Sequence, residues 1–290
     1  MNENSITSSK LVQNIKLKLY LLKKSPLSIV GIFLILITFS LATFAPFIAP
    51  YPNDVKDVHM RLIYKPPSKN NLMGTDFMGR DILSRCVFGL RVSILLGIAV
   101  VALSAGIGIS LGLIAGYIGG RTRTIIMRIT DIFFTIPGIA LALIVASILG
   151  PSLTNAMIAL SFTWWPSYTR LTQGLVLSIK QEMYIEASKS LGSNPLRIIY
   201  KDILPNCLAV LVVKCTMDMG WAVLSGAGLS FLGMGVQPPY PELGSMISEG
   251  RELLPTVWWP TFFPGIFILI SVLGLNLFGD GLRDMLEIEL

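Results

Sequence analysis

Lys214 and Asp218 are the two residues whose types and spacing could do chemistry within the otherwise uncharged residues 207–232. Because they stand four positions apart, a helix would place both on one face, where a lysine and an aspartate can pair. If that helix spans a membrane, each charge costs about 2.5 to 3.5 kcal/mol at its centre. Two interpretations stay open: the polar lining of a water-filled path, or a structural ion pair between helices.

Other chemistry-bearing residues are sparse and form no catalytic or metal-binding pattern. The three cysteines are too few, and odd in number, for a disulfide framework, so we expect Cys86, Cys207 and Cys215 to be small buried hydrophobic residues. The one histidine, His59, makes no metal site alone. The sequence has no phosphate-binding Gly-x-x-x-x-Gly-Lys-Ser/Thr loop and no paired-histidine zinc motif. We therefore predict no catalytic, cofactor or metal site, and any energy-driven step would need another chain.

The composition is typical of a chain that lies in a lipid bilayer. Of the 290 residues, 53% are hydrophobic and 14% are charged, whereas roughly a quarter of residues carry charge in soluble domains. This balance excludes an intrinsically disordered chain and argues against an aqueous enzyme. Four stretches carry no charge and are long enough for the roughly 20 apolar residues of a spanning helix. They are residues 28–50, 92–120, 132–169 and 253–279.

These stretches predict an all-α polytopic membrane protein with six transmembrane helices, since an open sheet in lipid would leave backbone groups unpaired. Residues 132–169 are long enough for two spans, with Gly150 and Pro151 where a tight hairpin turn would fall. Residues 207–232 supply another span. Within a transmembrane domain of residues 27–290, we expect spans at about residues 28–49, 92–118, 129–149, 152–178, 207–232 and 256–279.

Lysine and arginine residues beside the spans predict the orientation. The inside holds more of them when the N-terminus is cytoplasmic, so we expect both termini inside, residues 1–26 as a cytoplasmic segment and residues 50–91 as an external loop. The first apolar run exceeds that of a cleaved signal peptide and is expected to be retained. A short amphipathic helix at about residues 80–88 would lie at the interface or cap the bundle. The N-terminal basic residues are Lys10, Lys16, Lys18, Lys23 and Lys24.

Small residues recur every four positions along the second expected span and line one face of it. Such a stripe lets another helix backbone approach closely, which drives helix association in lipid. We expect a helix contact here, although the stripe could equally line a conduit. At the start of the third span, Arg128 and Asp131 are expected to reach the cytoplasmic interface. The stripe comprises Ser104, Gly108, Gly112 and Gly116.

Residues 180–206 form the longest expected cytoplasmic segment and carry the most specific pattern. Gly192 predicts the end of a short helix, because glycine accepts the left-handed conformation found there. Asn194 or the serine before it would cap a second helix, with Pro195 in its first turn and Pro205 closing it. Two short helices joined at a glycine predict a rigid knob that projects from the membrane and fits a partner's cleft.

This segment resembles the EAA loop of binding-protein-dependent ABC importer permeases. That pattern reads Glu-Ala-Ala, three residues, Gly, nine residues, Ile, one residue, Leu-Pro. Ser188 replaces the second alanine, and Asp202 stands at the isoleucine position with Ile203 beside it. The resemblance implies a coupling helix that docks on an ATP-hydrolysing subunit. The residues that match the pattern are Glu186, Ala187, Gly192, Leu204 and Pro205.

Three further stretches are similar to the C-type permease subunit of the dipeptide, oligopeptide and nickel transport family. They are residues 74–85, 229–239 and 276–284. Asn71 and Met73 depart from the residues often found before Gly74, and Gly226 stands where many peptide permeases carry a glutamate. Together with the EAA-like segment, the similar stretches extend over nearly the whole chain.

The resemblance implies a type I ABC importer permease fold in the bacterial cytoplasmic membrane. A second permease subunit would complete a heterodimer whose halves share one pathway, and two cytoplasmic subunits would bind ATP and Mg²⁺. An extracytoplasmic solute-binding protein would deliver the cargo, and no nucleic acid takes part. The implied cargo is di- or oligopeptides, with nickel or a metallophore as the alternative. The chain would not itself be an enzyme; a membrane enzyme or a gated channel are remote alternatives.

Overall fold

The computed structural model describes residues 26–52 and 55–287, and within these residues it is built of helices without a β-strand. The N-terminal lysines lie outside the described residues. The longer helices are α2 (Pro26–Thr43), α4 (Ile82–Ile118), α5 (Gly120–Phe134), α6 (Gly138–Leu149), α7 (Leu153–Ile179), α10 (Leu204–Phe231) and α12 (Trp259–Glu287). The shorter ones are α3 (Ala45–Ile48), η1 (Met60–Leu62), α8 (Met183–Ser190), α9 (Pro195–Arg197), η2 (Ile198–Ile203), α11 (Leu243–Gly250) and η3 (Arg251–Leu253).

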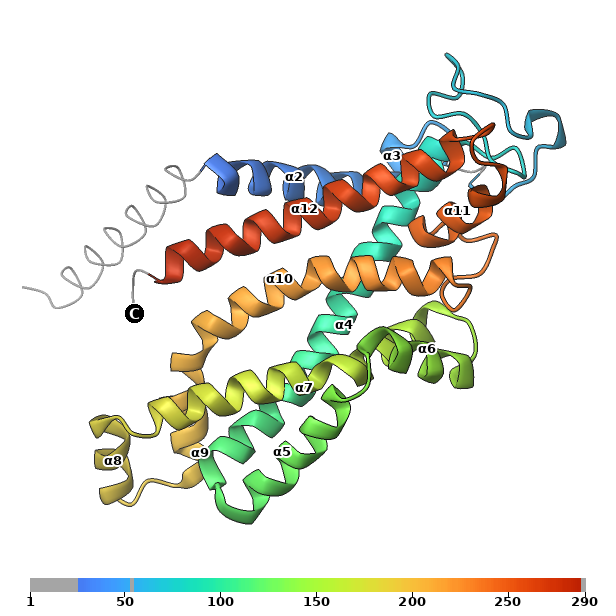
Figure 1. Ribbon diagram of the computed structural model, residues 1–290. Coiled ribbons are helices and arrows are strands. Elements are labelled where there is room, and N and C mark those ends of the chain that lie inside the picture. Colours follow the sequence, from blue (N-terminus) through green and yellow to red (C-terminus); the bar gives the residue numbers. More distant parts are fainter. Residues whose placement is uncertain (1–25, 53–54, 288–290) are drawn as a thin grey trace, which may run out of the picture.

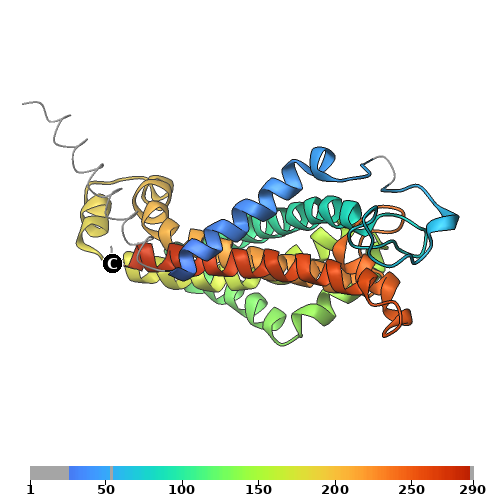
Figure 2. The ribbon, with the colours of Figure 1, turned by 90° about the horizontal axis from the view of Figure 1, so that it is seen from above.

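The long helices form an elongated bundle whose two ends differ (Figure 1). At one end α8 and α9 project from the bundle, whereas α11 and the loop of residues 50–81 cover the other end (Figure 2). The start of α2 and the end of α12 both lie at the α8 end (Figure 1). The described chain thus begins and ends on one side of the bundle.

Among the described residues, four helices are long and apolar enough to cross a membrane: Pro26–Thr43, Ile82–Ile118, Pro195–Phe231 and Trp259–Met285. The bent pair α5 and α6 makes a fifth if it counts as one span. α7 has the length of a span, with 27 residues, but polar residues such as Arg170 make it less apolar. By length and composition, the described residues supply four or five of the six expected spans.

The expected amphipathic helix at residues 80–88 is not a separate element at the membrane surface. It is the first part of α4, which runs without a break for 37 residues. Asp81 begins this helix by accepting a hydrogen bond from the Ser84 N–H at 2.8 Å. Ile82 and Cys86 are fully buried within the protein. The expectation of a separate short helix is wrong, because the segment continues into α4; of the two expected environments, its apolar side chains contact protein, at α11 and the loop.

Two of the expected spans are interrupted. Residues 129–149 do not form one straight helix. They comprise the end of α5, which begins before this range, and the whole of α6, and the two helices meet at a bend of 90°. Pro137 explains the bend, since proline cannot donate a backbone hydrogen bond and disfavours helical geometry in the residue before it. Residues 28–49 are likewise split at Phe44 into α2 and α3. The turn between α6 and α7 falls at Gly150, as the sequence predicts.

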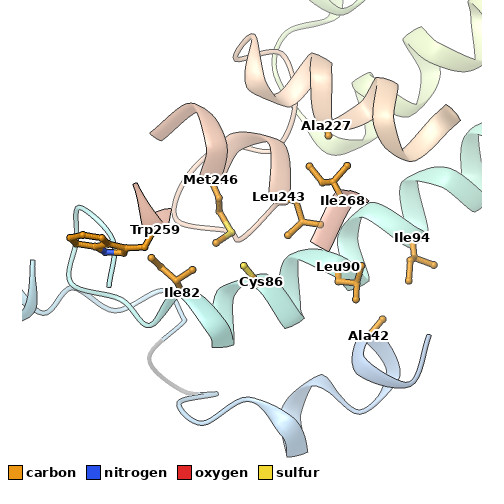
Figure 3. Packing of buried hydrophobic residues seen from close by; sticks show 10 residues of the cluster. All are labelled: Ala42, Ile82, Cys86, Leu90, Ile94, Ala227, Leu243, Met246, Trp259 and Ile268. Atoms are coloured by element: carbon orange, nitrogen blue, oxygen red, sulfur yellow. The ribbon is translucent and has the colours of Figure 1, made fainter. Parts of the chain in front are cut away.

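A hydrophobic cluster joins α4, α10, α11 and α12 at the loop end of the bundle (Figure 3). Trp259 at the start of α12 belongs to it, and its indole Nε1 donates a hydrogen bond to the Thr75 carbonyl at 3.1 Å. The loop is therefore fixed to the bundle through both apolar and polar contacts. Of the three cysteines expected to be buried, Cys86 and Cys207 are buried, whereas Cys215 is only partly so.

The loop end also contains a cluster of four charged side chains. Three of them lie in residues 74–85, a stretch already singled out by its sequence, although the sequence does not indicate that they pair with Glu249. Asp76 Oδ2 accepts a hydrogen bond from Arg80 Nε at 2.8 Å and pairs with Arg85 Nη1. Glu249 of α11 lies 3.4 Å from Arg85 and 3.6 Å from Arg80. Burial raises the pKa of the Glu249 carboxyl, although the two arginines act in the opposite direction. Since both arginine side chains are fully buried, the cluster fastens α11 to α4 and the loop.

Arg85→Ala is expected to destabilise this end of the protein. The substitution leaves Asp76 and Glu249 buried without one of their partners, and breaking a buried ion pair costs about 3 to 5 kcal/mol. Arg91→Ala, at an exposed position of the same helix, is the matched control and should change stability by no more than about 0.5 kcal/mol. Thermal unfolding of the detergent-solubilised protein measures both. Equal melting temperatures for the two variants would contradict the role assigned to Arg85.

Candidate coupling loop and translocation path

Residues 180–206, which we call the EAA-like loop, fold as the short helix α8, a turn at Gly192, as the sequence predicts, and a second helix that begins at Pro195 and continues into α10. After α8, Gly192 has a φ of 73°, in the left-handed region. The Asn194 side chain caps α9 by accepting a hydrogen bond from the Leu196 N–H at 2.9 Å, and Pro195 stands in the first turn. No described atom lies within 4 Å of the position of a Cβ on Gly192. The left-handed backbone conformation at position 192, and not a lack of space for a side chain, therefore favours glycine here.

Pro205 does not close the second helix, contrary to expectation. Residues Ile198–Ile203 form a π-helical turn, η2, which leads directly into α10. The helix Pro195–Phe231 consequently passes through the proline. In the π turn, the Leu204 N–H donates to the Ile199 carbonyl five residues earlier. A proline in a regular α-helix clashes with the carbonyl four residues before it, and the wider π turn relieves that clash.

The EAA-like loop buries some of its apolar side chains and exposes others. Ile185 of α8 and Ile203 of η2 are fully buried, and they pack in one cluster with Leu113 of α4 and Val176 of α7. This cluster anchors the loop on the ends of two long helices. Contiguous exposed apolar side chains on a membrane protein's polar end indicate a surface for another protein. The large exposed ones are Met183, Tyr184, Leu191, Leu196 and Tyr200.

Ser188 and Asp202, the two positions that depart from the EAA pattern, contact each other. Ser188 Oγ donates a hydrogen bond to Asp202 Oδ2 at 3.2 Å, which joins α8 to η2. Asn206 Nδ2 donates to the Tyr184 hydroxyl at 3.1 Å, which joins α8 to the start of α10. Burial, together with nearby carboxylates, raises the pKa of that hydroxyl. Neither contact is evident from the sequence pattern, and both hold α8 against the helix that follows it.

The end of α7 is attached to the end of α4 beside the EAA-like loop. Lys180 Nζ donates a hydrogen bond to the Tyr117 carbonyl at 2.6 Å and lies 5.4 Å from the centre of the Tyr117 ring. Burial lowers the pKa of Lys180, and the charge of Lys189 adds to the effect. Among the residues that the pattern singles out, Glu186, Ala187, Gly192, Pro195 and Pro205 are exposed, and Ser188 and Leu204 are half-buried.

The small-residue stripe of α4 lies against α7. A Cβ on Gly108 would stand 2.4 Å from the carbonyl oxygen of Trp165. A Cβ on Gly112 would stand 2.7 Å from the carbonyl oxygen of Thr169. Both distances are far below van der Waals contact, so a larger side chain would force the helices apart. The other members, Ser104 and Gly116, face Ser161 and Val176 of the same helix.

Helix α4 also contains a Gly-x-Ser-x-Gly spacing, residues 108–112, with Ser110 at its centre. In hydrolases this spacing forms a sharp turn between a strand and a helix, which exposes a nucleophilic serine. Here the spacing lies inside α4, and Ser110 Oγ donates to the Gly106 carbonyl at 2.7 Å. The spacing therefore belongs to a packing helix and not to a nucleophile elbow.

Lys214 and Asp218 pair with each other on α10, with 2.9 Å between Nζ and Oδ2, so the pair does not bridge two helices. Lys214 Nζ also lies 5.1 Å from the centre of the Tyr168 ring on α7. Asp218 lines a cavity of about 450 Å³ between α10, α7 and the bend from α5 to α6. This placement favours the polar lining of a path over a bridge between helices.

A second ion pair joins α5 to α7 near the same bend. Arg170 Nη2 pairs with Asp131 Oδ1, and both side chains are half exposed. The Arg170 guanidinium lies 4.3 Å from the centre of the Phe134 ring. The expectation that Asp131 reaches the cytoplasmic interface beside Arg128 is wrong, because Asp131 is near the end of α5, where Arg170 meets it. The isolated charge of Arg170 within residues 152–178 is the sequence signal that could have indicated this pair.

A helical membrane bundle with an EAA-like loop at one end defines the class of ABC importer permease subunits, and comparison with known families agrees. Residues 108–288 match the family described as binding-protein-dependent transport system inner membrane component. Residues 19–67 match the N-terminal transmembrane domain of oligopeptide transport permease C. The chain belongs to the family of binding-protein-dependent transport system inner membrane components, and it is a multi-pass inner-membrane protein.

Individual relatives are similar over most of their length. The chain is 44% identical over 269 residues to the dipeptide transport system permease protein DppC of Haemophilus influenzae, covering 91% of this chain and 90% of the relative. It is 42% identical over 265 residues to the di/tripeptide transport system permease protein DppC of Pseudomonas aeruginosa, covering 89% and 86%. Its fold resembles a chain of the inward-facing MetNI methionine ABC transporter, with a TM-score of 0.57 and 22% identity, covering 70% of this chain and 97% of that one.

Proposed function

We propose that this chain is a permease subunit of an ATP-driven importer of di- or oligopeptides and that it forms half of the translocation pathway. The relatives named above are dipeptide and di/tripeptide permeases that match 91% and 89% of the chain, which favours peptides over nickel or a metallophore as cargo. The observation that carries the coupling role is the EAA-like loop. It projects rigidly from the bundle and exposes 85% of both Met183 and Leu191.

The proposed topology has six crossings, made by α2, α4, the bent pair α5 and α6, α7, α10 and α12. α7 counts as a crossing because it is long enough and because its neighbours α4 and α10 are apolar spans. Both termini and the EAA-like loop then lie in the cytoplasm, with residues 1–26 as a cytoplasmic segment. The loop of residues 50–81 and α11 face outward, toward a solute-binding protein.

The proposed assembly contains a second permease subunit, two cytoplasmic ATPase subunits and an extracytoplasmic solute-binding protein. The ATPase subunits hold ATP and Mg²⁺, so this chain performs no hydrolysis itself. In alternating access, the permease pair switches between a state open to the outside and a state open to the cytoplasm. Nucleotide and loaded binding protein can drive this switch only if each binds one state more tightly than the other.

The contacts of the EAA-like loop supply a route for the movement. Closure of the ATPase subunits on ATP would displace α8. Hydrogen bonds join Ser188 of α8 to Asp202 and Tyr184 of α8 to Asn206 of α10. A displaced α8 would therefore move the start of α10 with it. α10 bears Lys214 and Asp218, whose position in the bundle would shift in turn. The loop therefore connects nucleotide binding to the cavity.

Transport by the reconstituted complex tests the proposed function. In proteoliposomes holding both permeases, the ATPase subunits and the binding protein, radiolabelled dialanine is expected to accumulate against its gradient only when ATP is supplied. Radioactive nickel is the matched probe for the alternative cargo and is expected to stay at background. Accumulation of nickel but not of dipeptide would overturn the assigned cargo, and dipeptide flux without ATP would indicate a gated channel.

A further inference from the structure

The cavity beside Asp218 is lined by polar, aromatic and backbone groups from three parts of the bundle. Its volume of about 450 Å³ is ample for a small peptide. Thr163, Trp164 and Ser167 line it from α7, and Asp218 and Trp221 line it from α10. The third part is the bend between α5 and α6, which includes Pro137.

The bend is itself a sign that water reaches this place. Residues 135–137 leave the helical ladder between two helices set at 90°. At membrane depth, irregular backbone is tolerated only where it is buried in protein or lines a water-filled cavity. Ile136 and Pro137 line the cavity, so the second condition applies here.

Both ion pairs lie near the cavity and at a similar depth. At about 1.5 Å of rise per residue, Asp131 stands roughly 16 Å from the start of α5, Arg170 roughly 14 Å from the end of α7 and Asp218 roughly 21 Å from the start of α10. Those helix ends all lie at the α8 end of the bundle (Figure 1). In the proposed topology, with those helix ends at the cytoplasmic face, the charges fall near the middle of a hydrocarbon core of about 30 Å, where ionisable residues mark substrate paths.

The charges are balanced and partly accessible. Lys214 with Asp218 and Arg170 with Asp131 amount to two positive and two negative charges, and all four side chains keep some exposure. Aromatic rings flank both pairs: Tyr168 faces Lys214, and Phe134 both faces Arg170 and lines the cavity. A ligand charge can replace one partner of each pair, because the displaced side chain, Lys214 at 27% exposure or Asp131 at 50%, is open to solvent rather than fully buried.

We propose that this cavity is a binding subsite for a small zwitterion, namely a dipeptide with a free ammonium and a free carboxylate. The ammonium takes the place of Lys214 against Asp218, beside the rings of Trp164 and Trp221, which attract a cation. The carboxylate takes the place of Asp131 against the Arg170 guanidinium, whose planar fork suits a carboxylate. The proposal rests on the proposed function as a peptide importer and adds where, and by which charges, the peptide is held.

Cysteine protection tests occupancy of the cavity directly. In the assembled complex in nanodiscs, with Cys215→Ser removing the partly exposed native thiol, Ser167→Cys is expected to react with a charged methanethiosulfonate. Millimolar dialanine should slow the reaction, whereas N-acetyl-dialanine amide, which has neither charge, should not. Ser68→Cys in the exposed external loop is the control, and its labelling should be indifferent to both compounds. An unreactive Ser167→Cys, or equal protection by the two compounds, would overturn the proposal.

A charge-neutral double variant separates binding from structure. Lys214→Gln with Asp218→Asn keeps the size and hydrogen bonding of the pair but removes its charges. It is expected to lower dialanine uptake about tenfold or more, because the loss of a charged hydrogen bond weakens the binding of the dipeptide by about that factor. The stimulation of ATPase activity by the loaded binding protein should persist. Thr216→Ala on the same helix should leave uptake unchanged. Unchanged uptake by the double variant would refute the subsite alone, whereas absence of ATP-dependent uptake by the unaltered complex would refute the proposed function.

Discussion

Replacing Gly192 with proline is expected to abolish ATP-dependent uptake while the protein still inserts and pairs with the second permease. The φ of 73° at Gly192 is outside the reach of proline, whose ring holds φ near −65°. The chain must then leave α8 in another direction, and the exposed residues before the turn, Met183 and Leu191, no longer form one surface with Leu196 after it. Uptake and binding-protein-stimulated ATPase activity of the reconstituted complex measure the result.

Gly192→Asn is the matched control for this experiment. Asparagine visits the left-handed region more readily than other residues with a side chain, and the space around Gly192 is open. The asparagine variant should therefore keep most of the uptake, and Gly192→Val, with a β-branched side chain, should fall between the two. Equal loss in the asparagine and proline variants would show that the backbone conformation is not what matters.

Gly108→Val is expected to prevent accumulation of folded protein. The new Cβ would lie 2.4 Å from a backbone oxygen of Trp165, which a change of side-chain rotamer cannot relieve. Overpacking a well-packed core costs about 1 to 3 kcal/mol and sometimes more, and a contact with backbone belongs at the upper end. Size-exclusion chromatography of the detergent extract, followed by thermal unfolding of any monodisperse fraction, measures the effect.

Gly106→Val on the same helix is the control for helix propensity. No described atom lies within 4 Å of a Cβ placed there, and Gly106 is exposed. Gly106→Val has the same intrinsic effect on helix stability as Gly108→Val, but its new Cβ contacts no described neighbouring residue. If both variants fold equally well, the close contact of α4 with α7 is not essential to the fold.

Features that depend on neighbouring residues along the chain are predictable from the sequence. Gly192, Asn194 and Pro195 each act through the geometry of their own turn, and the structure has the helix end, the cap and the helix start where the sequence predicts them. The spacing of Gly108 and Gly112 is equally local, since small residues at every fourth position lie on one helix face whatever the surroundings.

Features that depend on distant partners are not predictable in this way. Asp76 and Glu249 are 173 positions apart, and nothing in either neighbourhood indicates that two buried arginines join them. The isolated charge of Arg170 indicates that a partner exists, but identifying that partner as Asp131 requires knowing that α5 ends beside α7. The continuity of α4 is not predictable for a related reason: the amphipathic pattern near its start favours a separate interfacial helix, whereas its charged side chains are buried against partners in the loop and α11.

The contact between Ser188 and Asp202 shows the limit of a pattern as a guide. Each is a departure from the EAA pattern when taken alone, yet together they form a hydrogen bond of 3.2 Å between α8 and η2. A pattern read position by position cannot reveal that two departures compensate for each other.

Site-specific photocrosslinking tests the central claim, that the EAA-like loop docks on the ATPase. A benzophenone amino acid at Leu191, a side chain 85% exposed at the tip of the loop, is expected to crosslink the full complex to an ATPase subunit. The same group at Leu72, 62% exposed in the loop at the opposite end, serves as the control and should crosslink no ATPase subunit. An intact complex in which position 191 yields no ATPase adduct, or in which position 72 yields one, would contradict the account.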